Sequence, residues 1–274
     1  MKFAEGLWFK VCTLIFMYKL LKDYPIIAMH SRYAPLVSKE VPPRVSRGRF
    51  KAYHPLDTYS TGTWIGFNEE ELFVAVTDQN TIGLDKVYRS RGLLAMDVLT
   101  SFSSVHEALD YVKREIVKGY RRTNIILADL SNAYHVLYDE RVEVEALSPG
   151  VHVFTNLTVK EWMDPSRVPS ELLKYVKMRE ERALELASMI RPIGIEEVVE
   201  KLKVIASDHH HGLTRGSICY HDDRGLRYQS SSTIMAVSNK LQGSKILYCR
   251  GNPCRSRFID YSHIISRGGL VGDI

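Results

Sequence analysis

Residues 11–18 read VCTLIFMY, a run of β-branched and aromatic residues with one cysteine near its start. This composition is typical of a buried strand, and a lone cysteine in such a strand is usually a small apolar residue. If the residues before Cys12 were removed, Cys12 would carry both a thiol and a free α-amine. A nucleophile at the start of a chain can use its own amine as the general base, and the two groups titrate close together, near about pH 8 and 8.5. Taken alone, the stretch favours the buried-strand interpretation.

The chain has an ordinary globular composition: 274 residues, 45% hydrophobic and 25% charged, with a formal net charge of +5. No shift in composition and no internal repeat divides it, so we predict a single domain over residues 12–274 after a leader of residues 1–11. Basic residues gather at Arg44, Arg47, Arg49 and Lys51. Because no series of aromatic residues accompanies them, we interpret this cluster as a solvated loop and expect no nucleic acid partner.

The ends of the chain and its cysteines indicate a cytoplasmic protein. Residues 1–11 lack the small-residue cleavage site of a secretory signal, and no run approaches the roughly 18 to 20 apolar residues of a membrane span. The cysteines are too few and too irregularly spaced for a disulfide scaffold. They are Cys12, Cys219, Cys249 and Cys254. A bridge between Cys249 and Cys254 stays open.

The hydrophobic pattern predicts strands and helices that are segregated along the chain. Residues 104–118 form the clearest helix, because apolar residues recur on one face and Ser104 and Glu107 match a capping box. The other expected elements are a proline-rich loop at 34–60, helices at 170–190 and 195–205, and strands at 12–18, 25–28, 62–67, 72–77, 124–128, 134–138, 151–155, 217–220, 232–237 and 245–249. An order of strands, helices and strands predicts an α+β fold with sheets and helices in separate layers.

Metal-ligating residue types gather between residues 208 and 223. They are Asp208, His209, His210, His211, Cys219, His221, Asp222 and Asp223. Three adjacent histidines cannot all face one ion from a regular element, and no pair of histidines here has the four-residue spacing of a helical zinc motif. We therefore interpret the segment as polar turns and expect no metal site, while adventitious nickel or zinc binding stays open.

Several motifs follow one another along the chain: CT at 12–13, PIIAMHSRY at 25–33, GTWIG at 62–66, SRGLL at 90–94, NIILAD at 124–129 and GVHVFTN at 150–156. In this order they resemble the transport and Golgi organisation protein 2 family, also called the NRDE-motif family. The later stretches SICYH at 217–221, SSSTIM at 230–235 and GNPC at 251–254 are similar to the acyl-coenzyme A:isopenicillin N acyltransferase family. Both belong to the N-terminal-nucleophile hydrolase superfamily, so the resemblance implies a four-layer αββα sandwich of two mainly antiparallel sheets.

The resemblance also implies a site built around Cys12 as the nucleophile. Asn156 matches an asparagine of the oxyanion hole in related cysteine amidases, and one such donor typically contributes about 10²- to 10³-fold in rate. Asp78 falls where relatives carry another asparagine of that hole, and a carboxylate cannot donate a hydrogen bond unless it is protonated. The residues expected to bind the substrate are His30, Trp64, Ser231 and Thr233. The hydroxyl-rich segment 230–233 also fits an ordinary strand start beside a turn.

The largest departure from the family pattern is HSRY at 30–33, where the Asn-Arg-Asp-Glu signature would lie. In related amidases an aspartate there contacts the amine of the nucleophile, whereas this chain places Arg32 at or near that position. Arg32 would repel an ammonium group, but it would also depress the pKa of the amine and stabilise a thiolate. A surface salt bridge and the bidentate capture of a substrate carboxylate or phosphate are its alternative roles.

Two functions fit these observations. In the first, the chain is a cysteine-dependent N-terminal-nucleophile amidohydrolase or acyltransferase without a cofactor, acting on a small acyl-amide or thioester through an acyl-enzyme on Cys12. In the second, it is a catalytically inactive protein of the same fold that binds a small hydrophobic or anionic ligand, such as a lipid, acyl-coenzyme A or a haem-like molecule. A shared fold does not guarantee a shared chemistry, so both stay open. The sequence also leaves open whether the chain forms a homo-oligomer.

Overall fold

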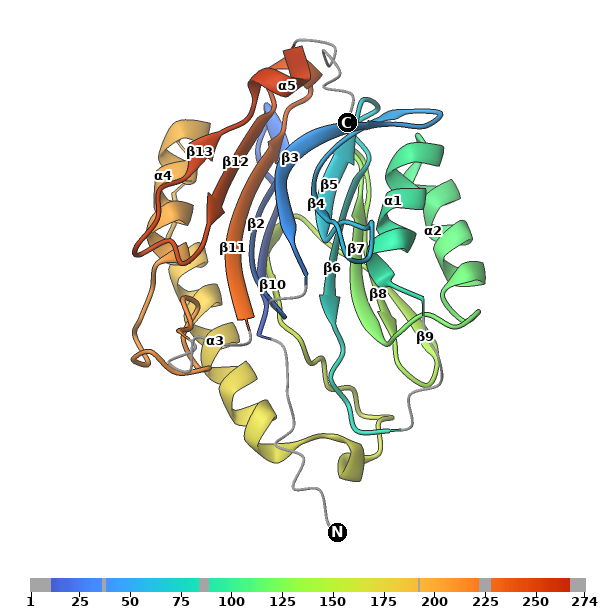
Figure 1. Cartoon of the computed structure of the whole chain (residues 1–274), viewed down its shortest axis with the longest axis vertical. Helices are drawn as coiled ribbons and strands as arrows, with labels where there is room; N and C mark the ends of the chain where they lie inside the picture. Colours follow the sequence, from blue (N-terminus) through green and yellow to red (C-terminus); the bar gives the residue numbers. More distant parts are fainter. Residues whose placement is uncertain (1–10, 36–37, 84–88, 192, 222–227, 267–274) are drawn as a thin grey trace.

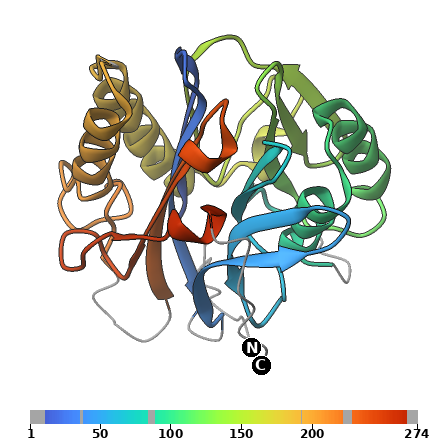
Figure 2. The same cartoon turned by 90° about the horizontal axis from the view of Figure 1, so that it is seen from above.

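The computed structural model describes residues 11–35, 38–83, 89–191, 193–221 and 228–266. Within them, two antiparallel sheets pack face to face, and helices cover the outer face of each sheet (Figure 1). The layers follow the order helix, sheet, sheet, helix, which is clearest from above (Figure 2). The predicted α+β fold with an αββα sandwich is therefore confirmed. No helix in the described chain combines the length and the apolar character needed to cross a bilayer.

The first sheet has the strand order β10-β1-β2-β11-β12-β13. Its strands are β1 Thr13–Leu21, β2 Tyr24–Pro35, β10 Gly150–Phe154, β11 Tyr228–Val237, β12 Lys245–Arg250 and β13 Ile259–Asp260. Successive side chains of a strand point to opposite faces, and β1 uses both. Ile15 and Met17 pack with the helices, whereas Leu14 and Phe16 pack with the second sheet. The apolar run at residues 11–18 thus contributes to both hydrophobic cores.

The second sheet has the strand order β3-β4-β5-β6-β7-β8-β9. Its strands are β3 Glu40–Arg47, β4 Lys51–Asp57, β5 Ile65–Asn68, β6 Phe73–Asp78, β7 Thr123–Ala128, β8 Ala133–Tyr138 and β9 Val142–Ala146. The prediction of a loop at 34–60 is wrong, because strands β3 and β4 lie within these residues. Pro42 and Pro43 are tolerated since β3 is an edge strand whose register is irregular between Val41 and Arg44.

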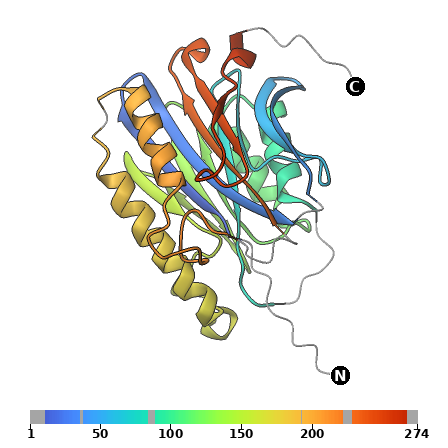
Figure 3. The same ribbon diagram turned by 60° about the vertical axis from the view of Figure 1, so that its left-hand side comes forward.

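Two pairs of helices form the outer layers. Helices α3 (Ser170–Ser188) and α4 (Ile195–Ala206) lie across the first sheet (Figure 3). Helices α1 (Arg91–Ser101) and α2 (Val105–Glu115) cover the second sheet, and α5 (His263–Ser266) is a short helix after β13. The three expected helices are confirmed to within a few residues. The capping box is wrong, because the side chain of Ser104 makes no cap hydrogen bond.

The remaining differences concern short elements. Residues 217–220 form turns and not the expected strand, while β9 and α1 were not expected. Helix α1 begins at a close approach of two glycines, because a Cβ on Gly62 would lie 2.4 Å from the carbonyl carbon of Gly92. Thr63 donates a backbone hydrogen bond of 3.1 Å to the Gly92 carbonyl. The GTWIG and SRGLL motifs therefore meet, and both reach the cavity described next.

Candidate active site

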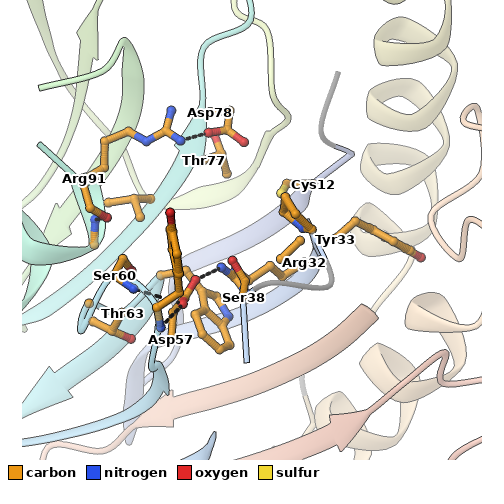
Figure 4. Close-up of a pocket in the computed structure, with 18 of the residues that line it drawn as sticks. Cys12, Arg32, Tyr33, Ser38, Asp57, Ser60, Thr63, Thr77, Asp78 and Arg91 are labelled. Atoms are coloured by element: carbon orange, nitrogen blue, oxygen red, sulfur yellow. Dashed lines mark hydrogen bonds and ion pairs between the residues drawn. The ribbon is translucent and has the colours of Figure 1, made fainter. Parts of the chain in front are cut away.

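A cavity of about 390 Å³ lies between the end of β2, the end of β6 and the start of α1 (Figure 4). The predicted site residues that line it are Cys12, His30, Arg32, Trp64 and Asp78. Most of the other lining residues are polar or charged. The structure therefore brings together five side chains that the sequence analysis took from four separate segments. Asn156, Ser231 and Thr233 are described but do not belong to the lining.

Cys12 stands directly before β1, with 5% of its surface exposed. Val11 precedes it and is also buried, so the nitrogen of Cys12 is a peptide amide in this chain. Two arginines, Arg32 and Arg179, are close enough for a Cys12 thiolate to raise the pKa of each guanidinium. A cation near a cysteine favours the thiolate form of its side chain.

Arg32 is a largely buried member of a charge network, with 13% of its side chain exposed, so a surface salt bridge does not describe it. Its two terminal nitrogens donate to Glu40 and, at 2.7 Å, to Asp57, and its guanidinium lies 4.2 Å from the centre of the Trp64 ring. Tyr248 donates a 2.9 Å hydrogen bond to the second oxygen of Glu40. Burial acts to lower the pKa of Arg32, but the two carboxylates raise it above its ordinary value. The positive charge of Arg32 is thus fully balanced by its neighbours.

Asp78, at the end of β6, forms an ion pair with Arg91 at the start of α1 (Figure 4). Both side chains are largely buried, and Ser90 caps the helix by accepting a 3.2 Å hydrogen bond from the nitrogen of Gly92. An arginine partner favours the ionised form of a carboxyl group. Asp78 therefore offers an acceptor to the cavity where an asparagine would offer a donor.

Asn156 follows β10 and is completely buried. Its side-chain oxygen accepts a 2.6 Å hydrogen bond from Arg179, and its backbone carbonyl accepts one of 2.9 Å from the nitrogen of Asn80. Its side-chain nitrogen is buried and has no hydrogen-bond partner among the described residues. A buried donor without a partner costs about 1 to 3 kcal/mol, so such groups are rare outside functional sites.

Arg179 is a buried charged residue near Cys12 that the sequence analysis missed. It lies on the apolar face of α3, between Val176 and Ala183, and is completely buried. Besides Asn156 it donates only to the backbone carbonyl of Arg215, and no carboxylate in the described chain forms an ion pair with it. Burial lowers its pKa to about 10. A charged residue at a core position of an otherwise apolar helical face was the signal that could have revealed it.

The remaining predicted residues occupy neighbouring positions of the first sheet. His30 donates a 3.1 Å hydrogen bond from Nε2 to the Val76 carbonyl, and burial lowers its pKa to about 4, so it is neutral at pH 7. In the pairing of β2 with β11, Ser231 lies opposite Arg32 and Thr233 lies opposite His30. The hydroxyls of Ser231 and Thr233 are buried, and that of Thr233 has no hydrogen-bond partner among the described residues. They border the site without reaching the cavity.

Two other expectations concern the cysteines and acidic residues near the end of the chain. Cys249 and Cys254 are free thiols in the structure, so the bridge that the sequence left open is not formed. Asp222 and Asp223 lie outside the described residues.

The described chain is thus an αββα sandwich with Cys12 directly before β1, a strand inside its first sheet. The chain belongs to the Transport and Golgi organisation 2 family, whose model matches residues 12–246. No curated protein matches the sequence.

Solved structures with a similar fold include penicillin V acylase from Agrobacterium tumefaciens, with 13% identity, a TM-score of 0.49 and coverage of 94% of this chain and 89% of that one. The N-acylethanolamine-hydrolyzing acid amidase ortholog from Caenorhabditis elegans has 15% identity, a TM-score of 0.47 and coverage of 82% and 92%. A variant of conjugated bile acid hydrolase from Clostridium perfringens has 12% identity, a TM-score of 0.47 and coverage of 91% and 96%.

Proposed function

We propose that this chain is a cysteine-dependent N-terminal-nucleophile amidohydrolase or acyltransferase that acts on a small acyl-amide or acyl-thioester. One observation carries the proposal: Cys12 lines the cavity and lies near Arg179, a buried cation that has no carboxylate partner in the part of the chain that the structure describes. A buried uncompensated cation favours an anion beside it, and a thiolate is the reactive form of cysteine. Residues 1–11 act as a leader whose removal exposes the amine of Cys12.

The residues then divide the reaction between them. The free amine of Cys12 takes the thiol proton, and Sγ attacks the substrate carbonyl carbon to form a tetrahedral intermediate. The side-chain nitrogen of Asn156 donates to the oxyanion, while Arg179 holds the Asn156 oxygen and so points that nitrogen away from itself. The leaving group departs with the proton of the ammonium. Water or an acceptor amine then attacks the thioester and regenerates the Cys12 thiolate.

Arg32 serves as a wall of the cavity in this scheme. Its terminal nitrogens are already used by Glu40 and Asp57, so it has no free fork for a substrate carboxylate or phosphate. His30, neutral and hydrogen-bonded to Val76, fixes the base of the cavity and carries no proton in the reaction.

The test compares the full-length chain with a variant that starts at Cys12 after removal of the initiator methionine. We expect turnover of acyl-amides or acyl-thioesters only in the shortened form, and covalent labelling of Cys12 by a thiol-reactive acyl analogue. Cys12→Ala in the shortened form should abolish both, whereas Lys174→Met, an exposed change on α3, should leave both unchanged. A shortened protein that neither labels at Cys12 nor turns over any substrate contradicts the proposal.

The pair of Asp78 with Arg91 favours a second candidate, a catalytically inactive protein that binds a small hydrophobic or anionic ligand. With Asp78 ionised, the oxyanion site has lost one neutral donor, and the full-length chain has no amine on Cys12. Binding of a fatty acid or acyl-coenzyme A to the full-length protein, with an affinity that survives Cys12→Ala, would support this candidate over the enzyme.

A further inference from the structure

Four metal-ligating side chains from separate parts of the chain meet beside the first sheet: His209, Cys219, His221 and Cys254. One ligand atom from each lies within 4.8 Å of the other three. The two sulfur atoms are 3.7 Å apart, and Nε2 of His221 lies 3.2 Å from the sulfur of Cys254 and 3.8 Å from that of Cys219. The rings of His209 and His221 are 5.0 Å apart between centres.

These distances fit a tetrahedral zinc ion. Zinc binds sulfur at about 2.3 Å and nitrogen at about 2.0 Å, so the ligand atoms of a tetrahedral site lie about 3.3 to 3.8 Å apart. The three distances measured between the sulfur atoms and His221 fall close to that range. Nδ1 of His209 is buried and has no hydrogen-bond partner among the described residues. A bound ion would supply the partner that a buried polar atom normally has.

The backbone around the cluster is already ordered for this geometry. The nitrogen of Cys219 donates a 3.0 Å hydrogen bond to the carbonyl of Asp208, which connects two of the ligand segments. Asn252 donates at 2.7 Å to the carbonyl of Tyr220, and its side-chain nitrogen lies 3.6 Å from the sulfur of Cys219. Outer partners of this kind hold the first ligands in place. Cys219 is buried and Cys254 is exposed, so an ion can enter from one side.

We propose that His209, Cys219, His221 and Cys254 bind one zinc ion as a closed structural site. Four protein ligands leave no open position for a water molecule or substrate, in contrast to a catalytic zinc site. Only one of the three adjacent histidines takes part, so the sequence argument against a metal does not apply. The other ligands come from the residues before β11 and from the turn after β12.

The zinc site would also fasten the loop that positions Arg179. The carbonyl of Arg215, between the ligands His209 and Cys219, accepts a hydrogen bond from Arg179. Tyr33, which lines the cavity, donates at 3.3 Å to the carbonyl of Ile218 and accepts at 2.7 Å from the nitrogen of Tyr220. Both neighbours of Cys219 are thus tied to the cavity wall. Through Arg179, the zinc site would also affect the reactivity of Cys12. That effect rests on the proposed function, whereas zinc binding itself does not.

The test uses the untagged full-length protein, stripped with a chelator and reloaded with Zn²⁺ under reducing conditions. We expect about one zinc per chain by elemental analysis, and the absorption of a tetrahedral thiolate-bound ion after replacement with Co²⁺. Cys254→Ser is exposed and should fold. It and His209→Ala should each weaken zinc binding by more than the roughly 10- to 100-fold that loss of an outer partner costs. His210→Ala, the exposed neighbour, is the matched control and should bind zinc normally.

Three results would overturn the proposal. Zinc bound equally well by Cys254→Ser and His209→Ala would show an adventitious ion only. An octahedral cobalt spectrum would exclude the sulfur ligands. A disulfide between Cys219 and Cys254 in freshly reduced and purified protein would show that the pair serves another purpose.

A separate readout tests the link to the cavity. Loading with zinc should slow amide hydrogen exchange over residues 208–219 and should raise the rate at which iodoacetamide modifies Cys12. Slower exchange without any change at Cys12 would support the zinc site and remove its connection to Arg179.

Discussion

Two arginines lie near Cys12, Arg179 completely buried and Arg32 largely so, and they differ in how their charge is balanced. On the side of β2, Arg32 is paired with Glu40 and Asp57 and stacked on Trp64. On the side of α3, Arg179 donates to two neutral oxygens, and no carboxylate among the described residues forms an ion pair with it. A compensated cation mainly holds its carboxylates in place, whereas an uncompensated one acts on any nearby group that can become an anion. We therefore expect Arg32 to act mainly on the stability of the fold and Arg179 to act on the thiol of Cys12.

The largest effect should come from removing Arg32, the arginine whose charge is balanced by two carboxylates. Arg32→Met leaves Glu40 and Asp57 buried without their cation, and breaking a buried pair in this way typically costs about 3 to 5 kcal/mol. We expect that loss in the free energy of unfolding, measured by urea denaturation. Arg44→Met, an exposed change on β3, should stay within about 0.5 kcal/mol of the unmodified protein. A loss below 1 kcal/mol for Arg32→Met would mean that the network of Arg32, Glu40 and Asp57 contributes little to the stability of the fold.

The second effect concerns the residue that Arg179 holds. In the protein that starts at Cys12, Asn156→Asp keeps an oxygen for Arg179 but removes the donor, so the rate of turnover should fall by about 10²- to 10³-fold. Asn132→Ala, in the turn between β7 and β8, is the control and should have no effect. Because the donor acts on the oxyanion, kcat should fall while KM changes little. An unchanged kcat would remove Asn156 from the oxyanion site.

The third effect concerns the pH dependence of stability and comes from His30, which lies two residues before Arg32 on β2. Its pKa of about 4 lies below the ordinary value of 6.5, mainly because of burial and further because of Arg32. The unfolded chain therefore binds more protons between these two values, and the free energy of unfolding falls as the pH falls, by up to about 1.4 kcal/mol per pH unit for this residue. Urea denaturation from pH 7 to 4.5 should give a shallower dependence for His30→Gln. Equal slopes would mean that His30 is charged in the folded protein.

The smallest effect distinguishes the two arginines directly. Arg179→Met should slow the alkylation of Cys12 by iodoacetamide at pH 7 by about tenfold, which corresponds to a rise of one unit in the pKa of the thiol. Lys174→Met, on the exposed face of α3, should not change the rate. The comparison between the two arginines fails if Arg179→Met alkylates at the original rate.

The sequence by itself determined the parts of the fold that depend on local patterns. The apolar runs along β1 and β2, the helical periodicity of α2, α3 and α4, and the order of these elements predict an α+β fold in separate layers. The αββα sandwich itself was implied only by the family resemblance of the motifs. The motifs also pointed to Cys12 and to two of the charged residues that line the cavity, Arg32 and Asp78. Local patterns are reliable here because a residue's burial in a regular strand or helix repeats with the period of that element.

Only the tertiary structure decided how charge and metal-binding groups are combined. Arg179 reads as one polar residue in a helix until α3 packs on the first sheet and buries it against Asn156. Likewise, Cys254 has no role in a sequence motif with His209, because the two residues lie 45 positions apart along the chain, the difference between their numbers. Contacts between distant segments depend on packing of the whole chain, and no local period encodes them. The charge balance at Cys12 and the Cys₂His₂ cluster are therefore properties of the folded molecule alone.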